Sequence, residues 1–287
     1  MSFNTARDVV VAAKNLFSLP DIFFQLNEMI RDPRYSLTDI GNVISTDPAL
    51  SARLLRIVNS AFYGYQAPID TISRAITVVG ADDFYNLVVA TEVVDRFAKI
   101  PCTLVDMTSF WLRSVHCSVL VGLLAKSSGI LKVERLFLAG LLHDIGSLVL
   151  YQYMPEQAAS VLRATQHNRR LLNAIERQII GFTHVEVGRE LLKSWGLPAS
   201  LYEVVGYQNN PGAAIAHRPD AHLLYLAVRL IDEKELGKPF EDSLVELPDR
   251  LLGDVHLNRI QLELAMEQSV VEFLVVFKQL LSEKHHH

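Results

Sequence analysis

The sequence lacks the features that mark secreted and membrane-spanning proteins. It has only two cysteines, Cys102 and Cys117, too few for a disulfide framework. No apolar run approaches the roughly 20 residues that a membrane helix needs. Its start lacks a basic segment followed by an apolar run and a small-residue cleavage site. We therefore expect a cytoplasmic protein with no membrane contact.

Positive charge is also in short supply. Lys and Arg number 27 against 32 Asp and Glu, a formal net charge of −5, and no long stretch concentrates the basic residues. This balance argues against a general nucleic-acid binder, which needs a basic surface to neutralise phosphates. Half of the residues are apolar, so the chain can bury a sizeable core.

Strand signals are missing as well. No convincing pair of alternating strands is joined by an Asn-Gly or Asp-Gly turn, and the apolar periodicity is helical almost throughout. The sequence therefore predicts an all-α fold. Asp47 followed by Pro48 indicates a helix start, with the helix ending near Asn59. A helix is expected to start at Asp70 and end at Gly80, and another to start at Asp82. A longer helix is expected to start at Asp106 or Thr108 and end by Gly129. Two more starts are expected at Thr183, with Glu186 completing a capping box, and at Pro198.

The second half of the chain contains one clear break. The loop-like stretch 209–212 follows Gly206, and a helical tail comes after it. Its last helix, about 258–281, carries an apolar series that we interpret as core rather than as a partner-binding face: Ile260, Leu264, Val271, Leu274 and Phe277. The predicted divisions are 1–105, 106–210 and 211–284, and residues 285–287 are three histidines typical of a purification-tag remnant.

The stretch Ala139-Gly-Leu-Leu-His-Asp-Ile-Gly146 is the most informative for chemistry. Adjacent His143 and Asp144 at the end of an apolar helix can both face one divalent cation. Such a pair needs further ligands from other helices. His116 and His184 are the candidates for that role.

Each of these residues also has a purely structural interpretation. His143 near a helix C-terminus interacts favourably with the helix dipole, and Asp144 can cap the next helix. His116 could be a core histidine, and His184 could be exposed to solvent. A loop of Asn59, Ser60 and Gly64 could serve recognition, but a helix end followed by a turn explains the same residues. The basic group Arg163, His167, Arg169 and Arg170 could contact a phosphate, but it is more typical of a solvated helix face.

Longer motifs resemble one known family. They are Asp47-Pro-Ala-Leu-Ser-Ala-Arg-Leu-Leu-Arg-Ile-Val-Asn-Ser-Ala-Phe-Tyr-Gly64, Ile72-Ser-Arg-Ala-Ile76 leading to Gly80, Gly140-Leu-Leu-His-Asp-Ile-Gly146, His184-Val-Glu-Val-Gly188 and Trp195-Gly-Leu-Pro198. In order and spacing they resemble the bacterial HDOD family, a branch of the HD superfamily, over roughly Leu19 to Tyr207. The resemblance implies an N-terminal helical bundle (1–105) packed on an HD-like helical domain (106–210) with a helical C-terminal extension.

HD-superfamily hydrolases hold metal ions that activate water against a phosphate ester. By resemblance, the metal ligands would be His116, His143, Asp144 and His184. The sequence departs from the pattern at Tyr207-Gln208, where relatives often have two histidines, and at Ala227-Val228, where an Ala-Asp step is usual. His217 and His222 lie near this gap, but we interpret them as surface residues. We therefore expect a degenerate site, holding at most one divalent metal ion at His143 and Asp144.

Two functions follow from this comparison. The resemblance favours a non-catalytic bacterial signal-transduction module that mediates protein or small-ligand interactions. Its expected partner is a sensor kinase or response regulator, and a nucleotide-type ligand and a homodimer stay open. The alternative is a metal-dependent phosphohydrolase or phosphodiesterase acting on a nucleotide or cyclic dinucleotide.

Overall fold

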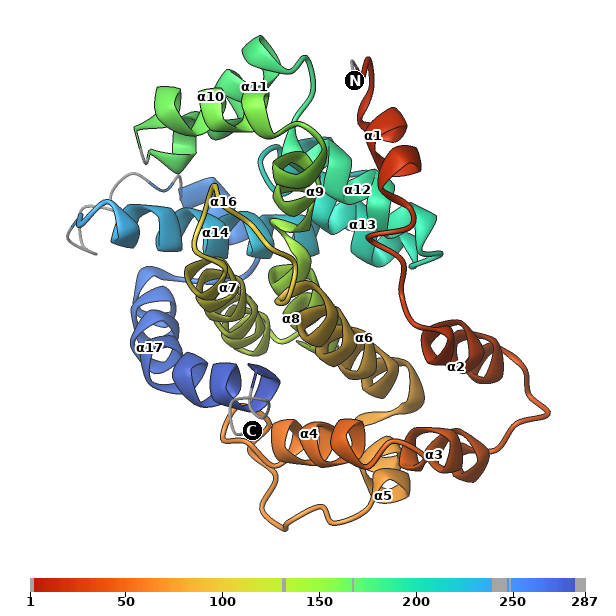
Figure 1. Cartoon of the computed structure of the whole chain (residues 1–287). Helices are drawn as coiled ribbons and strands as arrows, with labels where there is room; N and C mark the ends of the chain where they lie inside the picture. The colour runs from red at the N-terminus through yellow and green to blue at the C-terminus, as the bar shows by residue number, and fades with distance from the viewer. Residues whose placement is uncertain (1–2, 131–132, 167, 239–246, 248, 282–287) are drawn as a thin grey trace. The chain divides into compact units, whose positions relative to one another are not determined.

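The computed structural model describes residues 3–130, 133–166, 168–238, 247 and 249–281 (Figure 1). Within these ranges all regular secondary structure is helical, which confirms the predicted all-α class. The chain forms two compact units. Unit 1 comprises Met1–Ser18 and Pro101–Ser269, and unit 2 comprises Leu19–Ile100 and Val270–His287. The predicted divisions at 105 and 210 stay a prediction, and residues 285–287 lie outside the described part.

Several helix starts are as predicted from capping chemistry. Helix α4 (Pro48–Val58) begins after Asp47, whose carboxylate accepts hydrogen bonds from two backbone amides of the first turn. Helix α7 (Met107–Ser127) is capped by Asp106, which accepts from the Ser109 amide at 2.7 Å. At the start of α12 (His184–Ser194), Thr183 and Glu186 form the expected capping box.

Two predicted helix starts lie one or two residues from the observed ones. Helix α5 (Ile72–Val79) is capped by Thr71, whose hydroxyl accepts from the Arg74 amide, and not by Asp70. Helix α6 (Ala81–Phe97) begins directly after Gly80. Gly80 has φ +93°, a left-handed conformation that glycine adopts at low cost, so it both ends α5 and precedes α6.

Helix α7 is the core of unit 1. It packs on α8 (Val133–Leu142) and α14 (Arg218–Glu235). By length and composition α7 could cross a bilayer, but 78% of its most apolar window is buried inside the structure. Gly140 of α8 lies against the α7 backbone, where a Cβ would be 2.6 Å from Ser118 Cα. Gly140, the first glycine of the motif 140–146, therefore permits the close contact between α7 and α8.

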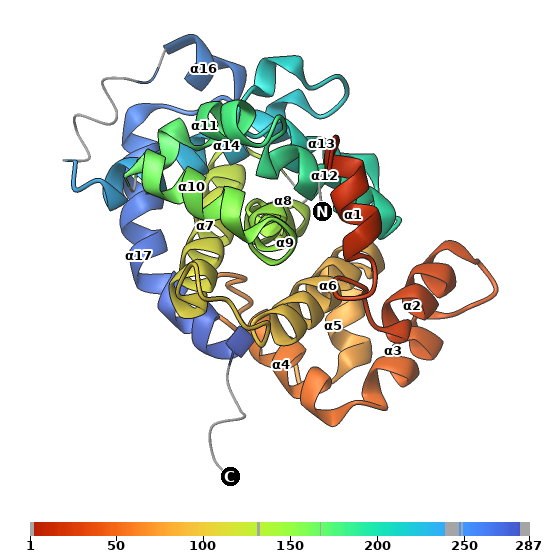
Figure 2. The ribbon, with the colours of Figure 1, turned by 45° about the horizontal axis from the view of Figure 1, so that its top comes forward.

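A second close contact joins α9 (Ile145–Tyr153) to α12, seen with α9 nearly end-on in Figure 2. A Cβ on Gly146 would lie 2.0 Å from the His184 carbonyl oxygen and 2.5 Å from the Gly188 amide nitrogen. The His-Asp-Ile-Gly and His-Val-Glu-Val-Gly motifs thus meet backbone to backbone. The other elements of unit 1 are α1 (Ala6–Ala13), α10 (Pro155–Thr165), η1 (Arg169–Leu171), α11 (Leu172–Ile179), α13 (Ala199–Gly206), η2 (Pro211–Ala213) and α16 (Asp249–Asp254).

Unit 2 contains α2 (Asp21–Arg31), α3 (Leu37–Ser45), α4, α5 and α6. The predicted recognition residues lie at the end of α4. The Asn59 side chain donates to the Ile69 carbonyl at 2.7 Å and accepts from the Ile69 amide at 2.8 Å. The Ser60 carbonyl accepts from the Gly64 amide, and Gly64 has φ +67°. These contacts close the turn after the helix.

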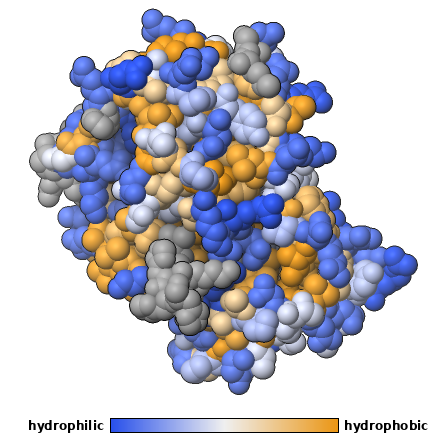
Figure 3. Space-filling model, in the orientation of Figure 1, coloured by the Kyte–Doolittle hydropathy of each residue, from blue (hydrophilic) through white to orange (hydrophobic). Residues whose placement is uncertain are grey.

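The last helix, α17 (Arg259–Leu281), corrects one sequence interpretation. The apolar series that we expected in the core is largely exposed: Ile260 is 68%, Leu264 58%, Val271 73% and Leu274 47% accessible. The helix instead buries its other face through Leu262, Ala265, Met266, Val276 and Leu280. Helical spacing alone could not choose between two apolar faces. Figure 3 shows hydrophobic surface over α17 at the lower left.

Candidate functional site

The His143-Asp144 doublet lies in the short link between α8 and α9, entirely inside unit 1. Both side chains are buried, at 1% and 2% exposure. His143 Nδ1 lies 2.7 Å from the Gly140 carbonyl oxygen, so the imidazole caps the end of α8, as the structural interpretation predicted. The His143 carbonyl accepts a hydrogen bond from Gln208 Nε2 at 2.7 Å. Gln208 therefore holds the doublet's backbone in place.

The Asp144 carboxylate does not cap α9. It forms ion pairs with two guanidinium groups: Arg169 Nη2 contacts Oδ2, and Arg113 Nε lies 3.4 Å from the same oxygen. Burial alone would raise the pKa of Asp144, but Arg169 and His143 hold it well below the usual range. An ionised carboxylate is thus buried against two arginines.

Arg113 of α7 links three carboxylates. In addition to Asp144, Nη2 donates to Asp232 Oδ1 and Nη1 donates to Glu235 Oε2, each at 2.6 Å. The Arg113 side chain is only 7% exposed. Burial alone would lower its pKa, but Asp232, Asp144 and Glu235 raise it. The guanidinium is therefore a permanent buried cation at the centre of the site.

His184 completes this cluster from the first residue of α12, and it is buried rather than solvent-exposed. Its Nε2 lies 3.4 Å from Asp144 Oδ1, and its Nδ1 lies 2.7 Å from Glu176 Oε2 on α11. The same Glu176 oxygen accepts from the His184 amide at 2.9 Å. Burial alone would lower the pKa of His184, but Glu176 and Asp144 raise it to about 9.

The structure does not bring His116 to this cluster. Its Nε2 lies 3.0 Å from Ser269 Oγ of α17, and burial lowers the pKa of His116 to about 4. Of the two downstream histidines expected at the surface, His217 is part-exposed near Asp220, whereas His222 is buried. The four residues named by resemblance therefore divide into a group of three, His143, Asp144 and His184, and a separate histidine.

These residues do not suit a divalent metal in the arrangement observed. A metal would have to share Asp144 with two guanidiniums. Although His143, Asp144 and His184 meet, neither they nor any other three His, Cys, Asp or Glu side chains among the described residues are arranged to hold an ion. The remaining cleft has a volume of about 20 Å³, room for about one water molecule. Of the three residues that depart from the family pattern, Gln208 and Val228 line it, whereas Tyr207 does not.

The sequence interpretation missed the cations. Arg169, which we predict from the sequence to lie on a solvated face, has a side chain that is 25% exposed and pairs with Asp144. Arg170 pairs with Glu233. Arg113 could have been suspected, because a charged residue inside an apolar helix needs a buried partner. Asp232 lies one turn after Val228, so helical periodicity places its carboxylate on the same face.

Comparison with known proteins identifies the family. Residues 16–211, more than half of the chain, match the sequence profile of the HDOD domain, so the chain belongs to the HDOD domain family. An uncharacterized protein of Treponema pallidum (strain Nichols) is 25% identical over 237 residues, which are 82% of this chain and 45% of that protein. This chain therefore spans less than half of that relative.

Solved structures share the fold. A "putative phosphohydrolase" from Shewanella amazonensis SB2B has a TM-score of 0.73 and 25% identity, with 95% of this chain and 98% of that chain covered. An HDOD domain protein with unknown function from Geobacter sulfurreducens has a TM-score of 0.69 and 21% identity, with 93% of each chain covered. HDOD proteins and phosphohydrolase-like proteins thus have this same helical architecture.

Proposed function

We propose that this protein is a non-catalytic HDOD signal-transduction module that acts through protein or small-ligand interactions in the cytoplasm. One observation carries the proposal: the Asp144 carboxylate is paired with the guanidiniums of Arg113 and Arg169. In a hydrolase of this superfamily the Asp of the doublet binds the metal that activates water. Here two permanent cations of the protein take that place.

Displacing these arginines would be costly. If Arg113 moved away, Asp144 and Asp232 would lose a buried partner, and stranding buried charges of this kind costs about 3–5 kcal/mol. The small volume of the cleft at Asp144, about 20 Å³, supports the same conclusion, because it has room for about one water molecule. The arginine network therefore favours a structural role for the doublet.

A signalling role is supported by membership of the HDOD family. The proposed macromolecular partner is a sensor kinase or a response regulator, consistent with the signalling context of HDOD proteins. A structure from Marinobacter aquaeolei VT8, described as a "putative signal transduction protein", has the same fold at a TM-score of 0.70, covering 66% of that chain. Its 20% identity supports the fold alone.

A hydrolysis assay tests the proposal against the phosphohydrolase alternative. Protein without residues 285–287 is incubated with bis(p-nitrophenyl) phosphate and cyclic dinucleotides, with Mn²⁺, Fe²⁺ or Mg²⁺ added in turn. We expect turnover no higher than that of Asp144→Asn in every condition. Metal-dependent turnover that Asp144→Asn abolishes, while circular dichroism shows the variant folded, would establish the hydrolase instead.

A further inference from the structure

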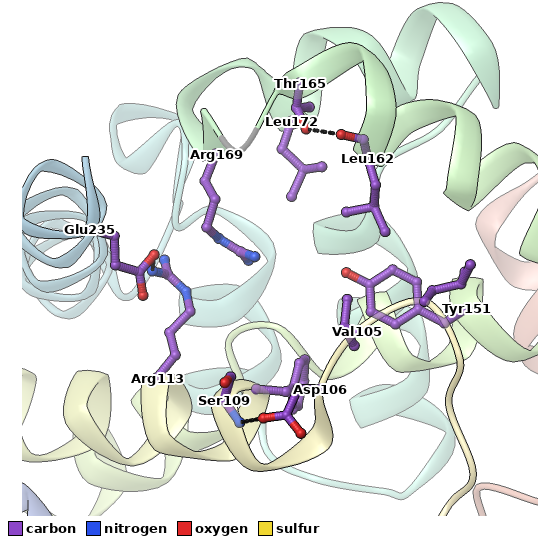
Figure 4. Close-up of a pocket in the computed structure, with 12 residues that line it drawn as sticks. Val105, Asp106, Ser109, Arg113, Tyr151, Leu162, Thr165, Arg169, Leu172 and Glu235 are labelled. Carbon is purple, nitrogen blue, oxygen red and sulfur yellow. Dashed lines mark hydrogen bonds and ion pairs between the residues drawn. The ribbon is translucent and has the colours of Figure 1, made fainter. Parts of the chain in front are cut away.

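A second cavity lies beside the arginine network. It has a volume of about 390 Å³ and opens between the start of α7 and the α10–η1 segment of unit 1 (Figure 4). Apolar and polar side chains both line it: Arg113, Arg169 and Glu235 lie together on one side, and the Tyr151 hydroxyl faces them from the other. The apolar lining residues include Leu104, Val105, Phe110, Leu162 and Leu172. This combination is typical of a small-molecule site, in which apolar walls provide affinity and a few polar groups fix orientation.

Two side chains offer hydrogen bonds to a ligand here. The Tyr151 hydroxyl points into the cavity in Figure 4. Arg169 also lines the cavity, and it contacts Asp144 through Nη2 and Asp232 through Nε. Among the described residues Arg169 Nη1 has no ion-pair or hydrogen-bond acceptor, so it can donate to a ligand.

Glu235 occupies the place on Arg113 where a ligand carboxylate would bind. It is the last residue of α14, its side chain is 45% exposed, and its carboxylate accepts from Arg113 Nη1 at the cavity edge. Because this carboxylate is part-exposed, it can turn toward solvent, at the cost of its ion pair with Arg113. A ligand carboxylate of the same charge could then replace it on Arg113 and reach Arg169 at the same time.

We propose that this cavity binds a small apolar monocarboxylate that displaces Glu235 and is anchored by Arg113 and Arg169. A multiply charged phosphate fits less well, because three carboxylates, those of Asp144, Asp232 and Glu235, already contact these two guanidiniums. The volume lies near the lower end of the range for small-molecule pockets, which fits about a dozen heavy atoms rather than a dinucleotide. The inference rests on the proposed function, because it makes such a ligand the signal that the module reads.

Isothermal titration calorimetry on the full chain tests the site with 4-phenylbutyrate as the probe. We expect 4-phenylbutanol, which lacks the charge, to bind about tenfold more weakly, since a charge-assisted hydrogen bond is lost. Arg169→Gln should lower the affinity for 4-phenylbutyrate by a similar factor. Arg163 is an exposed arginine of α10, and Arg163→Gln should leave that affinity unchanged. Glu235→Gln should strengthen binding, because it removes the competing charge while leaving Asp144 paired.

Glu235→Gln keeps the test valid if Arg169→Gln fails to fold. Equal affinity for the acid and the alcohol, no binding of 4-phenylbutyrate, or unchanged affinity in Glu235→Gln would each overturn the proposal. Tighter binding of adenosine monophosphate than of 4-phenylbutyrate would also overturn it, in favour of a phosphate site. Because none of these results depends on metal or turnover, they are separate from failure of the proposed function.

A different observation concerns the exposed face of α17. This helix is apolar on two opposite faces, and a helix of this kind is normally covered on both. The exposed stripe continues beyond Val271 and Leu274 with Val270 at 40% and Val275 at 48% accessibility. Two exposed charges, Glu267 and Lys278, lie on the same stripe at helical spacing.

The stripe is complementary to itself. In an antiparallel pair of α17 helices centred between residues 272 and 273, Val271 lies opposite Leu274 of a second copy, and Val270 lies opposite Val275. The same register places Glu267 opposite Lys278, twice by symmetry, as a two-fold interface requires. We infer that the occupant of this face is a second copy of the chain.

Sedimentation equilibrium of the full chain measures this association. Leu274→Lys should give monomers at concentrations where the wild type is dimeric, and circular dichroism checks its folding. Glu267→Lys should weaken the dimer by placing Lys opposite Lys278, and the double variant Glu267→Lys with Lys278→Glu should restore it. Glu156→Lys, an exposed position on α10, is the control. A monomeric wild type, or a double variant no tighter than Glu267→Lys, would overturn the inference.

Discussion

Arg113 Nη2 lies 2.6 Å from Asp232 Oδ1, joining two helices of unit 1 through side chains 119 residues apart in the sequence. The same guanidinium reaches Asp144 of the doublet. The His143-Asp144 doublet alone would suggest a metal-binding site, but an arginine and an aspartate form its centre. The stability and the chemistry of the site both depend on this pair.

Removing the buried cation should destabilise the protein strongly. Arg113→Met leaves Asp144 and Asp232 buried without it, so we expect the free energy of unfolding to fall by about 3–5 kcal/mol. Urea denaturation followed by circular dichroism measures the change. Arg34→Met is the control, because that arginine is 83% exposed and its pairing with Asp32 is screened by solvent. A loss no larger than that of the control would contradict the network's importance.

The motif glycine at 146 should not tolerate a methyl group. Gly146→Ala would place Cβ inside the van der Waals distance of the α12 backbone, so we expect a loss of about 1–3 kcal/mol or more, or a failure to fold. Gly212→Ala, with open space around its Cα, should be neutral. Thermal unfolding of the two variants compares them directly, and similar midpoints would exclude close packing as the reason for this glycine.

Gln208 should act through the doublet's backbone. Gln208→Leu leaves the buried His143 carbonyl without its donor, which costs about 1–3 kcal/mol. The exposed neighbour Asn209 provides the matched variant Asn209→Leu, for which no loss is expected. Urea titration distinguishes them. If Gln208→Leu were as stable as the wild type, the glutamine would need another explanation.

The charge of His184 should persist well above neutral pH. Its pKa is raised to about 9, so its protonated form stabilises the fold fully below its unfolded value of about 6.5. That contribution is lost as the pH rises through about 9. An NMR titration of the imidazole signals should show this midpoint, and Glu176→Gln should lower it. A midpoint near 6.5 in the wild type would mean that Glu176 and Asp144 do not hold the ring as described.

The fold was largely predictable from local signals. Cap residues such as Asp47 and Thr183 act within a few residues of themselves, so their helices could be placed from the sequence. Long-range choices could not be placed in this way. The outward orientation of Leu264 depends on which face of α17 the rest of the fold covers, and the pairing of Arg169 with Asp144 depends on α10 and η1 folding back over the doublet.

The candidate site was predicted in part. Three of the residues named by resemblance, His143, Asp144 and His184, do converge, and His116 instead contacts Ser269. Of the departures at Tyr207, Gln208 and Val228, the last two line the cleft and Tyr207 does not. The guanidiniums of Arg113 and Arg169 surround Asp144 in place of the expected ligands. They were not predicted, because only histidines and carboxylates were considered as candidate metal ligands.

Equilibrium dialysis against Mn²⁺, on protein lacking residues 285–287, tests the central claim most directly. If the guanidiniums of Arg113 and Arg169 neutralise Asp144, the protein should retain far less than one Mn²⁺ per chain, and Asp144→Asn should not change the amount. One tightly held Mn²⁺ per chain that Asp144→Asn abolishes would contradict the account.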